Sequence, residues 1–347
     1  MVSAGTLISA TWILASNSWM HTPQGHEIID GVAVPVDWWA VIFNPSFPYR
    51  LAHMTMAAFL ATALFVGAAG AWHLLRGNRT PAVRTMYAMA LGMVLVSAPL
   101  QVLVGDLHGL NTLEHQPAKI AAIEAHWENR PGEGVPLVLF GFPDMERETT
   151  RHAIEVPRLG SLILTHQWDG SIPALKDFPP EDRPNSLVVF WTFRVMAGLG
   201  FLMVLLGLCA AWSWRRGRLF ESRALARFAL WMGPSGIVAI LAGWFTTEIG
   251  RQPWVVQGLM RTKDAVSDHS ALTMSVTLAL LVVVYFAVFG IGTRYMLRLV
   301  GRVPEDVAEV AEPGPDPGRR PARPLSAATE RFDGPSAGRR RSSRETP

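Results

Sequence analysis

One carboxylate in an apolar part of the chain requires a chemical explanation. Glu248 lies close to the end of a long apolar stretch. A charged side chain inside a membrane-spanning helix costs about 2.5–3.5 kcal/mol on insertion scales, so Glu248 needs a partner or a function. Arg251 lies three residues later, on the same face of a helix, and can be its charge partner.

Two further side chains have the chemistry to bind a metal-containing group. His53 and Met196 each lie within about two turns of the start of an apolar segment, so they can lie at similar depth on neighbouring helices. An imidazole and a thioether at one level can bind a haem iron from both sides. Ala57 and Gly200, four residues later on each helix, are small enough for a flat macrocycle to approach. On spacing alone, a structural histidine and a packing methionine remain the alternative.

The composition indicates an integral membrane protein. The 347 residues are 50% hydrophobic and 17% charged, with a mean hydropathy of +0.22, whereas a soluble protein carries about 25% charged residues. The basic pI of about 9.3 does not indicate a nucleic-acid partner, because the arginines cluster beside apolar segments and in the tail. Membrane lipid is the expected surrounding. The single cysteine, Cys209, excludes an internal disulfide and a cysteine-based metal site.

The apolar segments predict an all-α membrane protein. A spanning helix needs about 20 mostly apolar residues. About six segments meet or approach this requirement: 2–20, 51–75, 86–105, 187–212, 226–247 and 270–293.

The distribution of arginine predicts the orientation of these helices. Arginines follow the second and fourth segments and cluster at Arg339–Arg341, and such regions face the cytoplasm. Residues 106–186, which we call the outer segment, then face outward; they carry thirteen acidic and seven basic residues and are too long for an idle linker. Residues 303–347 are rich in Pro, Gly, Ser and Arg and predict a disordered cytoplasmic tail. The chain thus divides into 1–105, 106–186, 187–302 and 303–347.

Three motifs resemble a known family. The stretch Gly243–Trp254, with the sequence GWFTTEIGRQPW, closely resembles a signature of subunit I of the cytochrome bd quinol oxidases. Phe47–Met54 and Phe190–Gly198 resemble the two helices of that family that carry the ligands of a low-spin haem b. The resemblance covers about residues 3–300 and implies the subunit I fold.

The resemblance assigns roles to individual side chains. It implies that His53 and Met196 ligate low-spin haem b and that Glu248 is an axial ligand of a high-spin haem. Arg194 matches a functional arginine that can hold a haem propionate or raise the haem potential; snorkelling to the interface is its alternative. Trp244, four residues before Glu248, matches a tryptophan among the haems; a place in the interfacial aromatic belt is equally compatible with the sequence.

The outer segment resembles a quinol-binding loop. Gln116–Glu124 resembles the start of that loop, and Lys176 and Glu181 match a lysine and a glutamate implicated in quinol oxidation. Quinol loses two protons and two electrons, so a basic donor and a carboxylate acceptor suit the reaction. Without the resemblance, these two charges would be an ordinary solvated surface. The short distance from Glu181 to the next helix looks like the short-loop branch, which includes cyanide-insensitive oxidases.

The resemblance implies a complete reaction and a partner. Subunit I of a cytochrome bd-type terminal oxidase oxidises quinol and passes electrons through haem b to a haem pair, high-spin haem b with haem d or a second haem b, which reduces O2 to water. The expected partner is subunit II, and the expected location is the bacterial plasma (inner) membrane.

The front of the chain differs from the family pattern. Gly5–Met20 looks like the family's fourth helix, so three helices, a histidine ligand of the haem pair and the acids of a proton path are expected to be missing. We therefore expect a truncated or mis-started subunit, one piece of a split subunit, or a degenerate copy with an incomplete haem pair. The alternative function is a non-catalytic haem-binding fragment or assembly partner; a transporter with Glu248 as its proton or substrate site is a further alternative.

Overall fold

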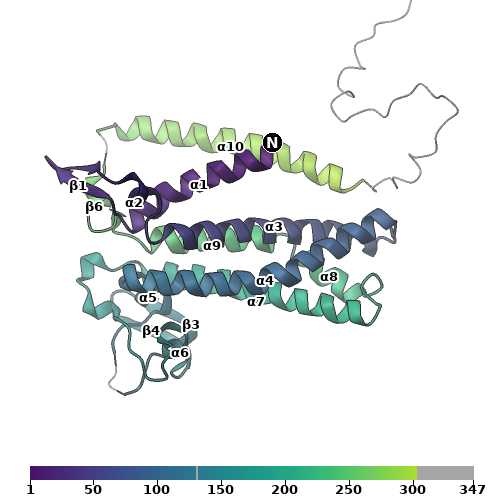
Figure 1. Ribbon diagram of the computed structural model, residues 1–347, viewed down its shortest axis with the longest axis horizontal. Coiled ribbons are helices and arrows are strands. Elements are labelled where there is room, and N and C mark those ends of the chain that lie inside the picture. Colours follow the sequence, from purple (N-terminus) through teal and green to yellow (C-terminus); the bar gives the residue numbers. More distant parts are fainter. Residues whose placement is uncertain (130–131, 267, 303–347) are drawn as a thin grey trace, which may run out of the picture. The chain divides into compact units, whose positions relative to one another are not determined.

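The computed structural model describes residues 1–129, 132–266 and 268–302, and the predicted tail 303–347 lies outside these residues. The described chain is mostly helical, as predicted, with three two-stranded antiparallel sheets (Figure 1). Its longer elements are α1 (Val2–His21), α3 (Phe47–Leu75), α4 (Pro81–His115), α7 (Ser186–Arg215), α8 (Arg223–Trp231), α9 (Ser235–Ile249) and α10 (Ala271–Val300). The shorter ones are β1 (His26–Ile29), β2 (Val32–Pro35), α2 (Trp38–Ile42), α5 (Pro117–Glu124), β3 (Leu137–Asp144), β4 (Thr149–Val156), α6 (Leu159–Thr165), η1 (Leu175–Asp177), η2 (Pro180–Asp182), β5 (Trp254–Val256), β6 (Met260–Arg261) and η3 (Thr262–Asp264).

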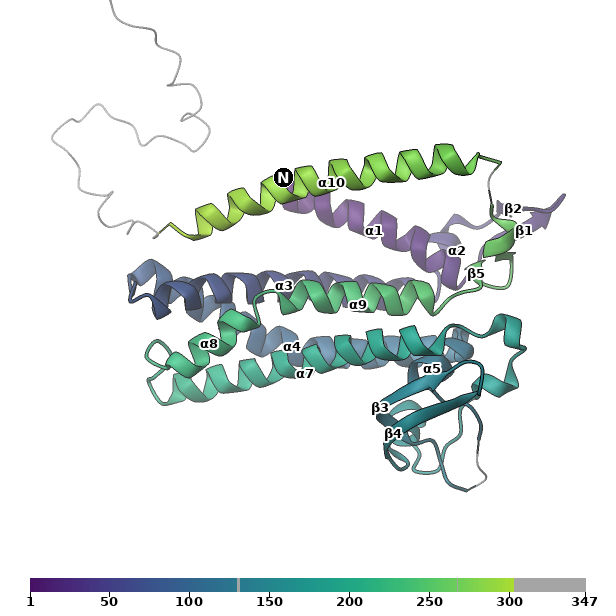
Figure 2. The same cartoon turned by 180° about the vertical axis from the view of Figure 1, so that it is seen from behind.

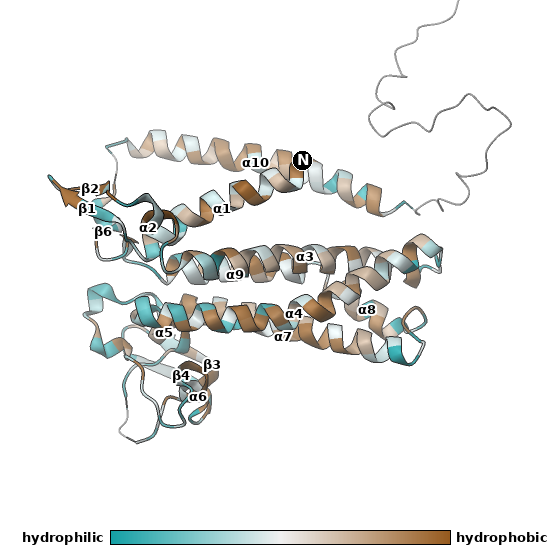
Figure 3. Cartoon of the chain, in the orientation of Figure 1, coloured by the Kyte–Doolittle hydropathy of each residue, from teal (hydrophilic) through white to brown (hydrophobic). Residues whose placement is uncertain are grey.

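Five stretches of the described chain are long and apolar enough to cross a membrane. They include α3, α4, α7, the pair α8 and α9, and α10. The segment 2–20, expected as a sixth span, forms the helix α1 but is not among the five. The span expected over 226–247 is divided into α8 and α9 at Gly233 and Pro234, because a proline lacks the amide hydrogen that would continue the helix. Figure 3 shows apolar residues along these helices.

Four helices form a bundle in which each packs on two neighbours. Helix α3 packs on α4 and α9, and α7 packs on the same two helices, so α3 and α7 are diagonal to each other (Figures 1 and 2). We call the end where α4 leads into α5 the outer end and the end where α3 leads into α4 the inner end. The buried core between these helices and α8 includes Leu60, Leu64, Val83, Tyr87, Leu91, Val94, Met203, Leu206, Leu225 and Met232.

Small residues set the register of the bundle. A Cβ atom at Gly207 of α7 would lie 2.9 Å from the Cα atom of Leu95 on α4. A Cβ atom at Gly236 of α9 would lie 2.5 Å from the Cα atom of Ala61 on α3. Both distances are shorter than side chains tolerate, so the helix backbones touch only because glycine is present. These two contacts fix how far each helix is displaced along its neighbour.

The outer segment is a small folded unit on the outer end of the bundle. Strands β3 and β4 pair in antiparallel fashion and lie close to α5 in Figure 2. The apolar side of α5 packs against α7 and the region around η1. The cluster that joins them contains Ile120, Ala121, Ala122, Ile123, Trp127, Val135, Ile172, Leu175 and Val189. This packing holds the outer segment against the helix that carries Met196.

We predict that Gly236→Leu destabilises the protein by about 1–3 kcal/mol or more, because the new side chain cannot be accommodated against Ala61 without separating α9 from α3. Gly92→Leu on α4 is the matched control, since nothing lies within 4 Å of a Cβ atom at that position. Thermal unfolding of the purified variants, followed by tryptophan fluorescence, measures the difference. Equal unfolding temperatures would show that the close contact does not set the helix spacing.

Candidate functional site

His53 and Met196 lie at one level on diagonal helices of the bundle. The Cβ atom of an alanine at Gly105 on α4 would lie 3.2 Å from Cε1 of His53. Gly207 of α7 lies against Leu95 of α4, and the two helices run in opposite directions. Met196 is eleven residues before Gly207, and Gly105 is ten residues after Leu95. With a rise of about 1.5 Å per residue in both helices, Met196 therefore lies at about the level of Gly105. The depth predicted for the two side chains from sequence spacing therefore agrees with their placement. Ligand pairs on facing helices are how helical bundles hold a haem or a metal.

The immediate surroundings of both side chains fit an iron-binding group. The Nδ1 atom of His53 is buried and has no hydrogen-bond partner among the described residues. The sulfur of Met196 lies 2.7 Å from the position of a Cβ atom at Gly243 on α9, so only a glycine leaves space for it there. His108 lies nearby, its ring centroid 5.5 Å from that of His53. An imidazole and a thioether are donors that can ligate a haem iron.

Glu248 is held at both of its carboxylate oxygens. Its Oε1 atom accepts a hydrogen bond of 2.9 Å from Nδ2 of Asn17 on α1. Its Oε2 atom lies 2.5 Å from Nη2 of Arg251, the charge partner that the sequence predicts. The Oδ1 atom of Asn17 in turn accepts from Nη1 of Arg50 at 3.5 Å. The carboxylate is thus oriented by an amide and paired with a cation, which offsets part of the cost of placing it in an apolar helix.

A group of buried basic side chains surrounds this carboxylate at the outer end. Arg50 and Lys119 are 6% and 3% exposed, and His21 is fully buried. The Nζ atom of Lys119 lies 2.6 Å from Oε1 of Gln116 and 3.1 Å from Nδ1 of His21. Burial, and then the positive charge of Arg50, lower the pKa of Lys119 well below its usual range. Burial thus disfavours the charged form of the Lys119 amine.

Arg194 joins the bundle to the outer segment. Its Nη2 atom lies 2.7 Å from Oε2 of Glu124 at the end of α5, and the side chains of Arg194 and Glu124 are 13% and 7% exposed. Its Nε atom donates a 2.9 Å hydrogen bond to the carbonyl oxygen of Val138 on β3. The guanidinium group also lies over the ring of Phe190, 4.6 Å from the centroid. Arg194, two residues from Met196, thus contacts both α5 and β3 of the outer segment.

The other predicted site residues are more exposed. Trp244 is 41% exposed and lies one turn before Glu248 on α9. The Nζ atom of Lys176 in η1 forms a surface ion pair of 2.9 Å with Glu128, and Glu181 in η2 is exposed. In the described part of the chain, Lys176 therefore pairs with Glu128 and not with Glu181.

Three residues of this region were not singled out from the sequence. Asn17, Lys119 and Glu124 make the buried polar contacts just described. Lys119 and Glu124 did lie inside the motif Gln116–Glu124. The sequence does contain one indication of their importance. These two charged residues lie among apolar residues in a short helix, and a charged side chain in a buried helix needs a partner.

Comparison with known proteins identifies the family. The family described as cytochrome bd terminal oxidase subunit I matches residues 1–304. This chain belongs to that family. The resemblance seen in its three motifs is therefore confirmed.

Individual relatives agree with this membership. The chain is 28% identical to the cytochrome bd-II ubiquinol oxidase subunit 1 of Escherichia coli (strain K12), over 90% of its own length and 74% of the relative's. It is 32% identical to the cytochrome bd ubiquinol oxidase subunit 1 of Bacillus subtilis (strain 168), over 86% of its length and 63% of the relative's. It is 30% identical to a putative cytochrome bd menaquinol oxidase subunit I of the same organism, over 85% of its length and 67% of the relative's. The chain thus spans about two thirds of the length of these relatives.

A solved structure supports the same conclusion for the fold. The bd oxidase from Geobacillus thermodenitrificans superimposes with a TM-score of 0.76 and 31% sequence identity. The similarity covers 87% of this chain and 69% of the other. The mostly helical, multi-span bd subunit I fold is therefore established for this protein.

We predict that Glu124→Gln costs about 3–5 kcal/mol of stability, because it leaves the buried guanidinium of Arg194 without its counter-charge. Glu128→Gln is the matched control: it interrupts the exposed pair with Lys176, and such pairs contribute about 0–1 kcal/mol. Denaturation of the purified variants measures both changes. Equal losses in the two variants would contradict a buried, structural role for the Glu124 pair.

Proposed function

We propose that this chain is the subunit of a bd-type terminal oxidase in which quinol is oxidised and electrons are passed towards O2. The observation that carries the proposal is the placement of His53 and Met196 at one level on diagonal helices, with the Nδ1 atom of His53 buried and unpaired within the described residues. Relatives named as ubiquinol and putative menaquinol oxidases support the same reaction class. Subunit II is the proposed partner.

His53 and Met196 are the proposed ligands of a low-spin haem b. Glu248 is the proposed ligand of a high-spin haem, and this high-spin haem would be paired with haem d or with a second haem b. Bound haem would supply one-electron redox chemistry, which no side chain of this region provides. Asn17 and Arg251 hold the carboxylate of Glu248 in one orientation, as partners of metal ligands commonly do.

The fixed charge of Arg194, two residues from Met196, favours an added electron nearby. Its ion pair with Glu124 and its hydrogen bond to β3 keep the guanidinium in place. Arg194 is therefore proposed to raise the affinity of the low-spin site for electrons. Trp244 is proposed to pack beside the high-spin site, since it lies on the same face of α9 as Glu248.

The outer segment is the proposed quinol site. Lys176 and Glu181 are proposed to contact quinol, and we add Glu124 as a candidate proton acceptor. Glu124 is a buried carboxylate at the border between the outer segment and the helix of Met196, so a proton and an electron could leave a quinol in the same neighbourhood. The proposed location is the bacterial inner membrane, with residues 106–186 outside and the arginine-rich loops facing the cytoplasm.

We predict that His53→Ala and Met196→Leu each abolish the low-spin haem b signal in a reduced-minus-oxidised absorption spectrum while the protein still inserts into the membrane. Each change removes one iron ligand without adding a charge to the bilayer. Met203→Leu, which alters a buried methionine two turns further along α7, should leave the spectrum intact. An unchanged six-coordinate spectrum in both ligand variants would refute the assignment.

We predict that Glu181→Ala, Lys176→Ala and Glu124→Gln slow quinol-dependent oxygen uptake, by up to about 10²-fold where an acid–base group is lost. The measurement uses the chain with its partner subunit in membranes and normalises uptake to haem content. Asp169→Ala, an exposed acid in the same outer segment, is the control and should retain normal uptake.

These variants also separate the possible outcomes. Normal kinetics in Lys176→Ala and Glu181→Ala, with slow turnover in Glu124→Gln protein that is folded and carries its normal haem content, would assign the proton acceptor to the buried pair alone. Normal kinetics in all three would remove the outer segment from quinol chemistry. A wild-type chain with haem b but without quinol-dependent oxygen uptake would instead support a non-catalytic haem-binding role.

A further inference from the structure

Helix α10 has an unusual environment for a helix of its length. None of the residues of Ala271–Val300 is buried, and both views show the helix separated from the four-helix bundle for most of its length (Figures 1 and 2). Its inner end is attached: Nε2 of His73 lies 2.8 Å from the carbonyl oxygen of Val300, and Trp72 lies beside Gly301. An apolar helix exposed over 30 residues must meet lipid or another apolar partner.

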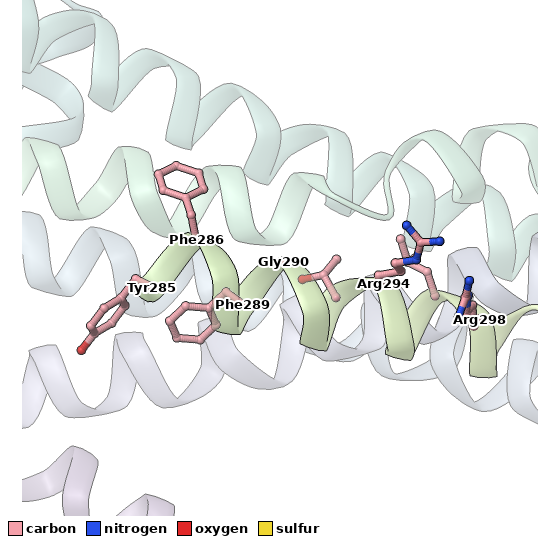
Figure 4. A pocket seen from close by; sticks show the side chains of 8 residues that line it. Tyr285, Phe286, Phe289, Gly290, Arg294 and Arg298 are labelled. Carbon is pink, nitrogen blue, oxygen red and sulfur yellow. The ribbon is translucent and has the colours of Figure 1, made fainter. Parts of the chain in front are cut away.

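A groove runs along one side of α10 and changes character from one end to the other. Figure 4 shows Tyr285, Phe286 and Phe289 at one end and Arg294 and Arg298 at the other. The groove is shallow and open, its lining residues all belong to α10, and its volume is about 750 Å³. Gly290 lies between the two groups and lines the middle of the groove. The groove is therefore apolar and aromatic along most of its length and cationic at its inner end.

The cationic end has no acidic side chain nearby on the two helices that meet there. Arg294 and Arg298 are four residues apart, so their like charges lie on the same helix face and repel each other. Arg76, at the end of α3, adds a third positive charge; its guanidinium stacks on Trp72, 3.9 Å from the ring centroid. Neither residues 38–105 nor residues 269–302 contain an Asp or a Glu. An anion between these arginines would be favoured by charge complementarity.

The dimensions of the groove match one leaflet of a bilayer. Phe286 and Arg298 are twelve positions apart, which corresponds to about 18 Å along the helix. The hydrocarbon of one leaflet is about 15 Å thick, half of the roughly 30 Å bilayer core. An acyl chain can therefore lie along Phe286, Phe289 and Gly290 while a phosphate group reaches the arginines.

We propose that the groove on α10 binds an anionic phospholipid of the inner-end leaflet, with its phosphate held by Arg294 and Arg298 and one acyl chain along Phe286, Phe289 and Gly290. The occupant requires both a negative head group and a long apolar chain. Inorganic phosphate satisfies only the arginines, and a neutral apolar helix satisfies only the aromatic part. The two-part character of the groove thus favours the phospholipid.

The charge requirement is tested by counting lipids retained on the purified full-length protein in detergent. The protein is titrated with phosphatidylglycerol or phosphatidylcholine, and the bound lipids are counted by native mass spectrometry. Each arginine near a membrane surface contributes about fivefold to the binding of anionic lipid, so Arg294→Gln with Arg298→Gln should weaken phosphatidylglycerol retention by about 25-fold. Arg215→Gln with Arg216→Gln, at the inner end of α7, is the matched control and should retain it.

The groove itself is tested by a pair of glycine variants. Nothing lies within 4 Å of a Cβ atom at Gly290 or at Gly292, so leucine fits at either position and favours the helix. Gly290→Leu fills the groove and should weaken phosphatidylglycerol retention several-fold, whereas Gly292→Leu, which does not line it, should not.

Four results would overturn the proposal. They are wild-type retention in the double arginine variant, equal retention of phosphatidylcholine and phosphatidylglycerol, displacement of phosphatidylglycerol by an equal concentration of inorganic phosphate, and normal retention in Gly290→Leu. The last result would show that surface charge acts without the groove.

Discussion

Contact between helix backbones at glycines determines the level at which the side chains of His53, Met196 and Glu248 lie in the bundle. Gly207 against Leu95 fixes α7 on α4, and Gly236 against Ala61 fixes α9 on α3. A displacement of one residue along either contact would shift a side chain by about 1.5 Å in depth and by about 100° around the helix. The shared level of His53 and Met196 therefore depends on packing several turns away from them. The haem site proposed for these two side chains would depend on this register, because an iron ion tolerates little displacement of its ligands.

Charge is the second organising constraint, and the structure separates buried charges from solvated ones. Glu248 with Arg251 and Glu124 with Arg194 are ion pairs whose members are largely or fully withdrawn from solvent. Lys176 with Glu128 lies on the surface. Buried pairs are expensive to assemble but strongly destabilising to break, so the pair between Glu124 and Arg194 helps to fix α5 against α7. Glu248 and Arg251 are only three residues apart, and their pair acts locally at the end of α9. The surface pair imposes no comparable requirement on the fold.

The sequence predicts the spans and the ligand candidates because these depend on local properties. Apolar length identifies α3, α4, α7 and α10, and helical rise alone places His53 and Met196 at matching depth. Arg251 is also a local prediction, since it is three residues from Glu248. By contrast, Asn17 and Glu248 are separated by 231 positions in the chain, and Glu124 and Arg194 by 70. No local sequence pattern indicates which distant polar side chains will form a contact. The pairing of Asn17 with Glu248 and of Glu124 with Arg194 is therefore known only from the folded chain.

The C-terminal end of α9 has an electrostatic consequence for the site. This helix of 15 residues ends at Ile249, directly after Glu248. The unpaired carbonyl groups at such an end carry about half a negative charge in total. Arg50, Lys119 and Arg251 therefore face the carboxylate and the negative pole of the helix together. A count of charged side chains near Glu248 gives more positive than negative charges. The partial negative charge of the helix end reduces this excess, so an electron or proton bound nearby would experience a weaker positive field.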